Sequence, residues 1–390
     1  MYVTRPLSMS RRCLNGFVDK PDDGPFSGYL VITDQQAREE NACCWGTCES
    51  DSVTKFPFPN DRILHFEPIN EDPTITKLWF IPVLDLPLSY NVYYIVCAEG
   101  KYRGLSCVCS REEDKVQGCF GRSIRDFKPV PFDYRDVYQK FKILTSGRGR
   151  FYAQSAASDG FPPACLRVKS WPVRTSGSYH ELQEARGLDD SLRSRLPDLN
   201  FPISNKCSDP VIVGKWFCPF VFFKVDGEIR KEMKRSMFYK MALKQRWEKI
   251  YACESMSYDT SDVTINVNIR KEDVSIFGMK AEKDDMRGLD GMVWFRVVQT
   301  EERTRRGIRW GMSTAVFEKM KWAQEKGGYI YDDNQAMEAN VAVDVNRGTG
   351  LGRGFCCYVL VESFVLTRLD GSTMMTYEFW HTQKTRTKWE

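Results

Sequence analysis

The strongest constraint on the fold is a pair of alternating apolar segments near the end of the sequence. Phe355 to Arg368 and Thr373 to His381 flank Asp370-Gly371, a residue pair that favours a type I′ turn because both central positions need positive φ. A two-residue turn at this point gives the cross-strand pairs Leu366–Met375, Phe364–Tyr377 and Glu362–Phe379. One face of the hairpin is then largely apolar, and a slip of one residue would expose it. The pattern predicts a long hairpin whose register is fixed by burial.

Further strands are predicted throughout the sequence by alternation of Val, Ile, Tyr, Phe and Trp with polar residues. The predicted strands are Gly28 to Asp34, Arg62 to Glu67, Thr76 to Val83, Asn91 to Ala98, Met237 to Leu243, Val263 to Ile269 and Met292 to Val298. Helix formers in Glu228 to Met241 leave a helix open there as an alternative. The clearest helix begins after Ser313, runs to Lys326 and is closed by two glycines.

The middle of the sequence differs in character. Ser146 to Arg150 and Ala153 to Gly160 are rich in small residues and indicate a mobile connection. A short strand is expected around Leu166 to Trp171. Two helices are expected after it, one with Ser178 and Glu181 as a capping box and one with Leu188, Leu192 and Leu196 on one face before Pro197.

The length of 390 residues exceeds the size at which single cores stop growing. The expected fold class is α+β and β-rich, with two predominantly antiparallel β blocks joined by a short helical or loop connection. Residues 1–145 are expected to form an N-terminal β-rich domain, residues 146–206 a connecting segment with short helices, and residues 207–390 a C-terminal α+β domain that ends in the long hairpin.

An internal similarity links the two expected blocks. Trp79-Phe80-Ile81-Pro82 and Trp216-Phe217-Cys218-Pro219 share the pattern WFxP, and each follows a Phe-Pro step. One interpretation is that the blocks are diverged copies of one β-rich fold. The other is that paired aromatic residues suit any buried strand, with no shared ancestry.

Charge and cysteine content bear on the compartment and the partners. The 56 Lys and Arg residues nearly balance the 52 Asp and Glu residues, for a net charge of +4, so that no global field attracts nucleic acid or anionic lipid. No apolar run has the length of a signal peptide or a membrane span. The 14 cysteines then indicate reduced thiols. We expect a protein of the cytoplasm or the nucleus that is not secreted and has no membrane span, and the charge balance disfavours nucleic acid as a partner.

Several motifs in the same order resemble one plant family. They are the opening MYVTRPLS, the strand Gly28 to Asp34, the run Trp79 to Ser89, VGKWFCPF at Val213 to Phe220, and Met237 to Ile250. The family is the one catalogued as domain of unknown function 1262. The resemblance implies plant origin and a link to stress and defence responses. It supplies no catalytic residue to carry over.

Metal or catalytic chemistry finds little support in the sequence. Cys44-x3-Cys48 and Cys107-x-Cys109 come near zinc-ligand spacing, but neither is a Cys-x2-Cys pair, and buried or surface thiols are favoured. The histidines His65, His180 and His381 are isolated. His381 is expected opposite Leu360 as a strand residue rather than a base. No cofactor or metal site is expected, and the catalytic residues, if any exist, are not identified.

The sharpest local charge feature is a candidate anion-binding loop. Its residues are Arg303, Arg305, Arg306, Arg309 and Trp310, because arginines interleaved with an aromatic residue bind phosphates or stack on bases. The alternative is a solvated hairpin tip. The glycines from Gly348 to Gly354 lie between two strand-like runs, which favours a flexible hairpin loop over a phosphate cradle.

Three functions remain open from the sequence. The first is a non-enzymatic interaction or regulatory protein with a protein partner, which is favoured over an enzyme. The second is an enzyme or small-ligand binder with its site between the two blocks, where pockets commonly form. The third is an RNA- or phospholipid-binding module that uses the arginine loop.

Overall fold

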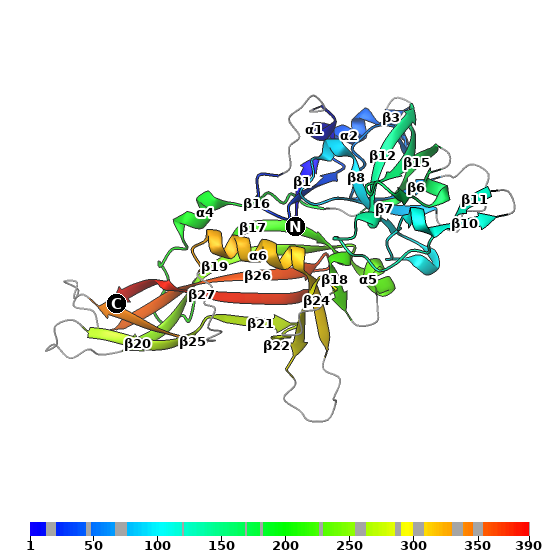
Figure 1. The fold of residues 1–390 in the computed structure, drawn as a ribbon. Coiled ribbons are helices and arrows are strands. Elements are labelled where there is room, and N and C mark those ends of the chain that lie inside the picture. Colours follow the sequence, from blue (N-terminus) through cyan, green and yellow to red (C-terminus); the bar gives the residue numbers. More distant parts are fainter. Residues whose placement is uncertain are drawn as a thin grey trace.

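The computed structural model contains two large sheets that pack against each other (Figure 1). It describes residues 1–12, 21–43, 48–66, 76–118, 121–167, 170–179, 182–225, 229–253, 263–284, 290–298, 308–329, 338–345 and 354–389. Strands are predominantly antiparallel, with β1 and β2 as a parallel pair. The expected β-rich fold class is confirmed.

The larger sheet, here the open sheet, has 12 strands. Its order is β18 (Phe223–Val225), β24 (Arg309–Ser313), β23 (Met292–Val297), β22 (Met279–Asp284), β21 (Glu272–Ile276), β27 (Thr373–Trp389), β26 (Phe355–Arg368), β19 (Phe238–Cys253), β17 (Val211–Pro219), β1 (Tyr2–Pro6) and β2 (Gly28–Ile32), and β16 (Gly187–Leu188) also pairs with β17.

The smaller sheet has seven strands and closes on itself, and we call it the closed sheet. Its order is β13 (Arg150–Ser155), β12 (Lys140–Gly147), β8 (Val92–Cys97), β7 (Lys77–Pro82), β6 (Arg62–Phe66), β15 (Trp171–Tyr179) and β5 (Ser52–Val53). The sheet closes because β13 pairs with β15 as well as with β12.

Short strand pairs, α-helices and a few 3₁₀-helices of one turn complete the described elements. The pairs are β3 (Ala42–Cys43) with β4 (Cys48–Glu49), β9 (Ser110–Arg111) with β14 (Gly160–Phe161), β10 (Lys115–Gly118) with β11 (Gly121–Ile124), and β20 (Val263–Arg270) with β25 (Glu338–Val345). The α-helices are α1 (Leu7–Arg12), α2 (Gln35–Glu40), α3 (Ala164–Arg167), α4 (Asp190–Arg195), α5 (Ile229–Arg235) and α6 (Thr314–Lys326). Helix α6 lies across the open sheet (Figure 1).

The final hairpin has the predicted register, but its turn differs. Leu366, Phe364 and Glu362 lie opposite Met375, Tyr377 and Phe379, and Leu360 lies opposite His381. The predicted type I′ turn is wrong, because that turn needs positive φ at both central residues. Gly371 has a positive φ of 87°, but Asp370 does not. The Gly371 N–H donates to the Arg368 carbonyl, and a register shift between Leu366 and Thr367 restores the predicted pairing. This is the longer loop with a left-handed glycine that also suits hairpins.

The two sheets share one core through both faces of β7 and β8. Leu78 and Phe80 point into the closed sheet, whereas Trp79 and Ile81 pack with residues of the open sheet. Trp79 is fully buried, stacks on Phe220 with ring centroids 6.1 Å apart, and donates its indole N–H to the Asn60 carbonyl. Alternate residues of these strands therefore contribute to two cores, which explains why both sequences are apolar after Lys77 at the start of β7.

The sheets divide the sequence differently from the expected boundaries. Strands β1 and β2 come from the segment expected in the N-terminal domain but extend the open sheet. Strands β13 and β15 come from the expected connecting segment but belong to the closed sheet. Pairing between distant segments decides membership of a sheet, and local composition carries no signal for it. The WFxP pattern occurs in two sheets of different closure, and Trp79 and Trp216 lie in the same core.

Three local predictions in the middle of the chain are wrong. The small-residue stretch around Ser146 to Gly160 forms the β12–β13 hairpin rather than a mobile connection, because its glycines make the turn and Phe151 and Ala153 are buried. Leu166 lies in α3 rather than in a strand, and Ser178 lies in β15 rather than at a helix start. The expected helix before Pro197 forms as α4, whose N-cap is Asp189, but it is shorter than predicted, because Leu188 lies in β16 and Leu196 follows the last helical residue.

A buried polar cluster joins α4 and α6 to the open sheet. Glu362 is fully buried on β26 and accepts hydrogen bonds from Arg193 Nε and Gln245 Nε2, both at 2.7 Å. Its second oxygen lies 2.9 Å from His381 Nε2 and also pairs with Arg193. Arg193 Nη1 donates to the Ala323 carbonyl of α6 at 2.6 Å. We call these residues the Glu362 cluster. Because its charges are paired, the Glu362 cluster stabilises the packing of α4 and α6 on the open sheet.

Gly327 at the end of α6 leaves the room that this cluster needs. A Cβ at Gly327 would lie 2.0 Å from Arg193 Nη2, and Arg193 cannot move without leaving Glu362. Gly327→Ala is expected to lower the free energy of unfolding by about 1–3 kcal/mol, measured by urea denaturation. Glu325→Ala, at an exposed position of the same helix, is the control and is expected to change it by less than about 0.5 kcal/mol. Equal effects of the two would contradict this role.

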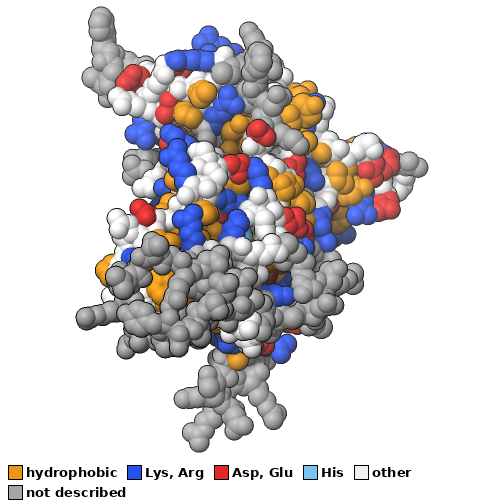
Figure 2. All heavy atoms as spheres, turned by 90° about the vertical axis from the view of Figure 1, so that its left-hand side faces the viewer, with side chains coloured by type: hydrophobic (Ala, Val, Ile, Leu, Met, Phe, Trp, Pro, Cys, Tyr) orange, Lys and Arg blue, Asp and Glu red, His pale blue; other side chains and the backbone are white. Residues whose placement is uncertain are grey.

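The surface carries mixed charge. Figure 2 shows Lys and Arg, Asp and Glu, and hydrophobic side chains interspersed over the described part of one face, which agrees with the near balance of basic and acidic residues. Within the described ranges, no helix is both long and apolar enough to cross a membrane.

Candidate anion site at the junction of the two sheets

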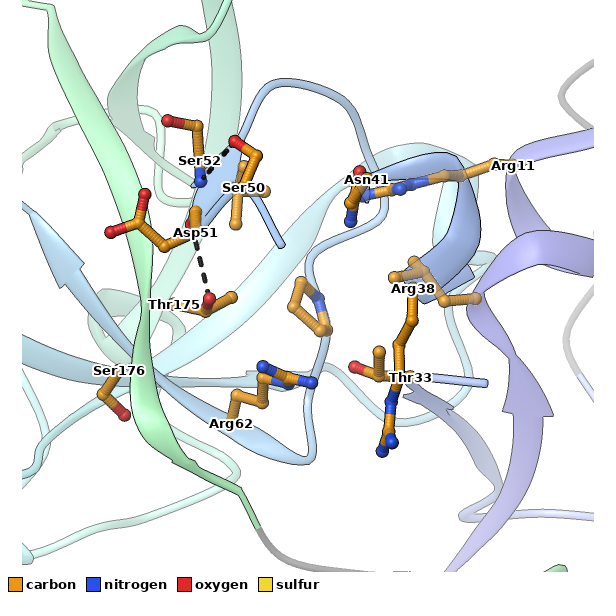
Figure 3. A pocket seen from close by; sticks show the side chains of 13 residues that line it. Arg11, Thr33, Arg38, Asn41, Ser50, Asp51, Ser52, Arg62, Thr175 and Ser176 are labelled. Atoms are coloured by element: carbon orange, nitrogen blue, oxygen red, sulfur yellow. Dashed lines mark hydrogen bonds between the residues drawn. The ribbon is translucent and has the colours of Figure 1, made fainter. Parts of the chain in front are cut away.

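A cavity of about 360 Å³ lies where the first helices of the chain meet the closed sheet. Three arginines line it, one each from α1, α2 and β6: Arg11, Arg38 and Arg62. Figure 3 shows Arg11 and Arg38 on one side, with Ser50, Ser52, Asp51 and Thr175 across the cavity. The remaining lining is Leu7, Thr33, Asn41, Val53, Pro59 and Ser176. We call this cavity the arginine pocket.

The chain positions Arg11 and Arg38 through two short helices that begin at adjacent strand ends. Strands β1 and β2 run parallel, so that α1 and α2 start at the same edge of the open sheet. Asp34 ties the two helices together, since its Oδ1 accepts the Ser8 N–H at 3.0 Å and its Oδ2 accepts the Ser8 hydroxyl. Both arginines lie in the last turn of their helices, where positive charge complements the helix dipole.

Arg11 carries one hydrogen-bond donor that the described part of the chain leaves without a partner. Its Nε–H is buried and has no hydrogen-bond partner in the part of the chain that the structure describes. Burial lowers the pKa of its guanidinium, and the charges of Glu40 and Asp34 oppose that effect. Those two carboxylates are engaged elsewhere, because Glu40 pairs with Arg12 at 3.5 Å and Asp34 with Ser8. A buried donor without a partner loses the energy of its bonds to water, and the residue that carries it lines the cavity.

Arg62 comes from the closed sheet, and the same segment joins the two sheets. Asn60 accepts the Val31 N–H at 2.7 Å and donates to the Phe80 carbonyl at 3.0 Å. Asp61 accepts from the Thr33 backbone at 2.9 Å and from its hydroxyl at 3.1 Å. Burial raises the pKa of Asp61, against these hydrogen bonds and the charge of Arg62. The floor of the pocket is therefore held by buried polar contacts between β2 and β6.

The opposite wall comes from the segment before β5 and from β15. The Asp51 carbonyl accepts the Thr175 N–H at 2.7 Å, and the Ser50 N–H donates to the Asn41 carbonyl at 2.9 Å. The Asp51 carboxylate lies 3.8 Å from Arg174 and is turned away from the three arginines (Figure 3). Serine and threonine hydroxyl groups thus face Arg11 and Arg38 across the cavity (Figure 3).

The predicted arginine loop does not form this site. Arg303, Arg305 and Arg306 lie outside the described residues. Arg309 donates to Asp284 at 3.1 Å and lies 4.9 Å from the Trp294 ring. Trp310 is fully buried in the core, so it is not available for stacking on a base at the surface, and that part of the prediction is wrong. Trp310 is buried because its ring packs against apolar residues of β18 and β23.

None of the cysteines and histidines that the structure describes lines the arginine pocket. Cys97, Cys107 and Cys109 are buried in the core of the closed sheet, as expected for small apolar residues, whereas Cys44 lies outside the described residues. No group of three or more potential metal ligands occurs among the side chains that the structure describes. His180 and the glycines from Gly348 to Gly352 also lie outside the description.

Little in the sequence identifies Arg11, Arg38 and Arg62 as residues of one binding site. Arg11 lies in an opening segment whose basic residues argue only against a signal peptide, and Arg62 falls in a predicted strand. The one local signal is that Arg11 and Arg38 each lie in the last turn of a short helix. Their meeting with Arg62 depends on the packing of β2 against the closed sheet, which sequence reasoning missed.

Comparisons with known proteins give a family and a distant structural likeness. Residues 23–120 match the family described as protein of unknown function (DUF1262), which confirms the resemblance for that stretch, and the stretch includes Arg38 and Arg62. The structure is similar to a solved structure described as "Crystal structure of Cry35Ab1", with 10% sequence identity and a TM-score of 0.49. The match covers 85% of this chain and 90% of that one. Curated proteins gave no match.

Proposed function

We propose that this chain, whose residues 23–120 match the DUF1262 family, binds a small anionic ligand in the arginine pocket. The observation that carries the proposal is the convergence of Arg11, Arg38 and Arg62 on one cavity, with the Arg11 Nε–H buried and without a partner among the described residues. Guanidinium groups favour phosphate and carboxylate because they donate two parallel hydrogen bonds to such anions.

The proposal selects one of the functions left open by the sequence. A ligand site between the two blocks was the second of them, and the arginine pocket lies between elements of the two sheets. The lining is rich in hydrogen-bond donors, which supports binding of an anion. We further propose that the protein is a non-enzymatic regulatory protein of the cytoplasm or nucleus, linked to stress or defence responses, and that ligand binding alters its contact with a protein partner.

Isothermal titration calorimetry with inorganic phosphate and sulfate tests the binding proposal. Arg62→Gln and Arg11→Gln are each expected to weaken binding by about tenfold to a hundredfold, since a hydrogen bond to a charged group contributes about 1.5–3 kcal/mol. Arg148→Gln, at an exposed turn of the closed sheet, is the matched control and is expected to bind as the unaltered protein does. The proposal would be refuted if neither phosphate nor sulfate binds. It would also be refuted if Arg148→Gln weakens binding as much as the two pocket variants do.

A further inference from the structure

We infer that the ligand of the arginine pocket is a polyhydroxylated anion, a free small molecule that carries several hydroxyl groups beside its acidic group, as sugar acids and sugar phosphates do. The inference rests on the proposed function and deepens it, because it concerns the neutral body of the ligand. Three features of the pocket support it: the hydroxyl groups of the lining, their place opposite Arg11, and the volume.

Hydroxyl groups are the commonest polar groups of the lining. Five of the thirteen lining residues are serine or threonine: Thr33, Ser50, Ser52, Thr175 and Ser176. A hydroxyl group both donates and accepts hydrogen bonds, whereas a guanidinium only donates and a carboxylate only accepts. Such a lining therefore matches a ligand whose own hydroxyl groups also donate and accept.

Several of these polar groups retain hydrogen-bonding capacity. Thr175 donates its hydroxyl proton to the Asp51 carbonyl at 3.3 Å and keeps its acceptor capacity. The Ser50 hydroxyl accepts the Ser52 N–H at 3.3 Å, and its own proton has no acceptor among the described residues. The Ser52 hydroxyl and the Asn41 side-chain amide have no hydrogen bond within the described ranges. These groups are available to a ligand.

The serines lie across the cavity from the group that attracts the anion. Figure 3 shows Ser50 and Ser52 opposite Arg11 and Arg38. Arg11 offers a buried Nε–H that has no partner in the described part of the chain. A ligand whose acidic group accepts from Arg11 therefore presents its far end to the two serines. Hydroxyl groups at that end form hydrogen bonds with the serines, whereas an apolar end removes the serine hydroxyls from water without replacing that contact.

The volume fits a body of about six carbon atoms. The cavity measures about 360 Å³, and at about 30 Å³ for each water molecule of the liquid it holds roughly a dozen of them. A six-carbon sugar acid has about as many non-hydrogen atoms, whereas a bare inorganic ion leaves more than half of the space empty. Leu7, Val53 and Pro59 are buried and line the same space, so that the C–H groups of a sugar ring find apolar contact.

The test compares compounds that differ in one group. Calorimetry at pH 7.5 would use glucuronate, glucose, which lacks the carboxylate, and cyclohexanecarboxylate, which has a six-membered ring and the carboxylate but no hydroxyl group. We expect glucuronate to bind at least tenfold more tightly than either, because it alone reaches both Arg11 and the serines. Glucose 6-phosphate is likewise expected to bind at least tenfold more tightly than inorganic phosphate.

Two variants assign the two ends of the ligand. Arg11→Gln is expected to bring the preference for glucuronate over glucose close to one. Ser52→Ala is expected to weaken binding of glucuronate about two- to tenfold, the effect of one hydrogen bond between neutral groups, and to leave cyclohexanecarboxylate unchanged. Arg148→Gln is the control and is expected to preserve both preferences. An equal loss for both carboxylates in Ser52→Ala would contradict the hydroxyl contact.

The outcomes separate the inference from the proposed function. The inference would be overturned, and anion binding would stand, if glucuronate binds no more tightly than cyclohexanecarboxylate and glucose 6-phosphate no more tightly than inorganic phosphate. A preference in one of these two comparisons would support the inference and identify the acidic group. Absence of binding by glucuronate, glucose 6-phosphate, inorganic phosphate and sulfate would overturn both. A linear trisaccharide of glucuronate that binds at least tenfold more tightly than glucuronate would overturn the assignment to a free small molecule.

Discussion

Replacing Glu362 by glutamine is expected to lower the free energy of unfolding by about 3–5 kcal/mol, the usual cost of removing one partner from a buried ion pair. Glu362 is fully buried and Arg193 is 6% exposed, so the variant leaves the Arg193 guanidinium in the core without its counter-charge. The Gln245 amide and the His381 ring contact different oxygens of Glu362, and glutamine keeps only one acceptor oxygen for the two of them. Urea denaturation at pH 7 gives the difference, with Glu318→Gln at an exposed position of α6 as the control.

The effect of Glu362 depends on pH in a defined direction. Burial alone would raise its pKa, but hydrogen bonds from His381 and Arg193 and their charges lower it to about 2 from 4.5. A carboxyl group with a lowered pKa in the folded state stabilises the protein above its unfolded pKa and loses that contribution as the pH falls toward the folded value. The difference between the unaltered protein and Glu362→Gln is therefore expected to shrink from pH 5 to pH 2. A constant difference over this window would contradict the assigned pKa.

A double substitution separates the ion pair from the packing around it. Arg193→Met combined with Glu362→Leu is expected to cost less than the sum of the single substitutions, since it removes both charges together. Additive losses would show that the two side chains stabilise the fold independently. That outcome would contradict the description of the Glu362 cluster as a unit that holds α4 and α6 on the sheet.

Replacing Trp79 by alanine is expected to lower the free energy of unfolding by about 3–5 kcal/mol, the usual range for a large aromatic residue in a core. Trp79 is fully buried, and its ring packs against Phe220 and Phe238 with centroids 6.1 and 5.0 Å away. The substitution leaves a cavity between the sheets and the Asn60 carbonyl without its indole donor. Tyr90→Ala, at a position 56% exposed beside the same strand pair, is expected to cost less than about 1 kcal/mol.

The shared core also predicts how the Trp79 variant unfolds. If the two sheets depend on one core, probes in each sheet should report the same transition midpoint in the unaltered protein. Trp79→Ala is expected to separate the two midpoints or to lower both together. Two separate transitions in the unaltered protein, with the Trp79 substitution affecting only one of them, would show that the sheets are independent.

The sequence predicts the parts of the fold in which neighbouring residues decide the structure. The register of the last hairpin follows from burial of one face, so alternation alone pairs Phe364 with Tyr377, as the strands do. The helix after Ser313 follows from its cap, whose hydroxyl accepts the Ala315 N–H at 3.2 Å. The turn itself does not follow from Asp370-Gly371, since the same pair suits a two-residue loop and a longer loop with a bulge.

The candidate site could not be predicted, because it depends on contacts between distant segments. Arg11 and Arg62 are 51 positions apart and meet because Asn60 and Asp61 bind the backbone of β2 and its end. The predicted place of Glu362 opposite Phe379 is correct, but its partner Arg193 lies 169 positions away. Alternation of apolar and polar residues predicts which face of a strand is buried. It does not predict which charged residue of another element contacts that face.

The central claim, that the arginine pocket holds an anion, is tested most directly at the Arg11 Nε–H. In protein with ¹⁵N-labelled arginine, the Nε–H resonance of Arg11 is assigned by its loss in Arg11→Lys. Titration with inorganic phosphate is expected to shift this resonance and slow its exchange with water, because a buried N–H without a partner among the described residues gains an acceptor. An Arg11 resonance that stays unchanged while phosphate is present at saturating concentration would contradict the claim.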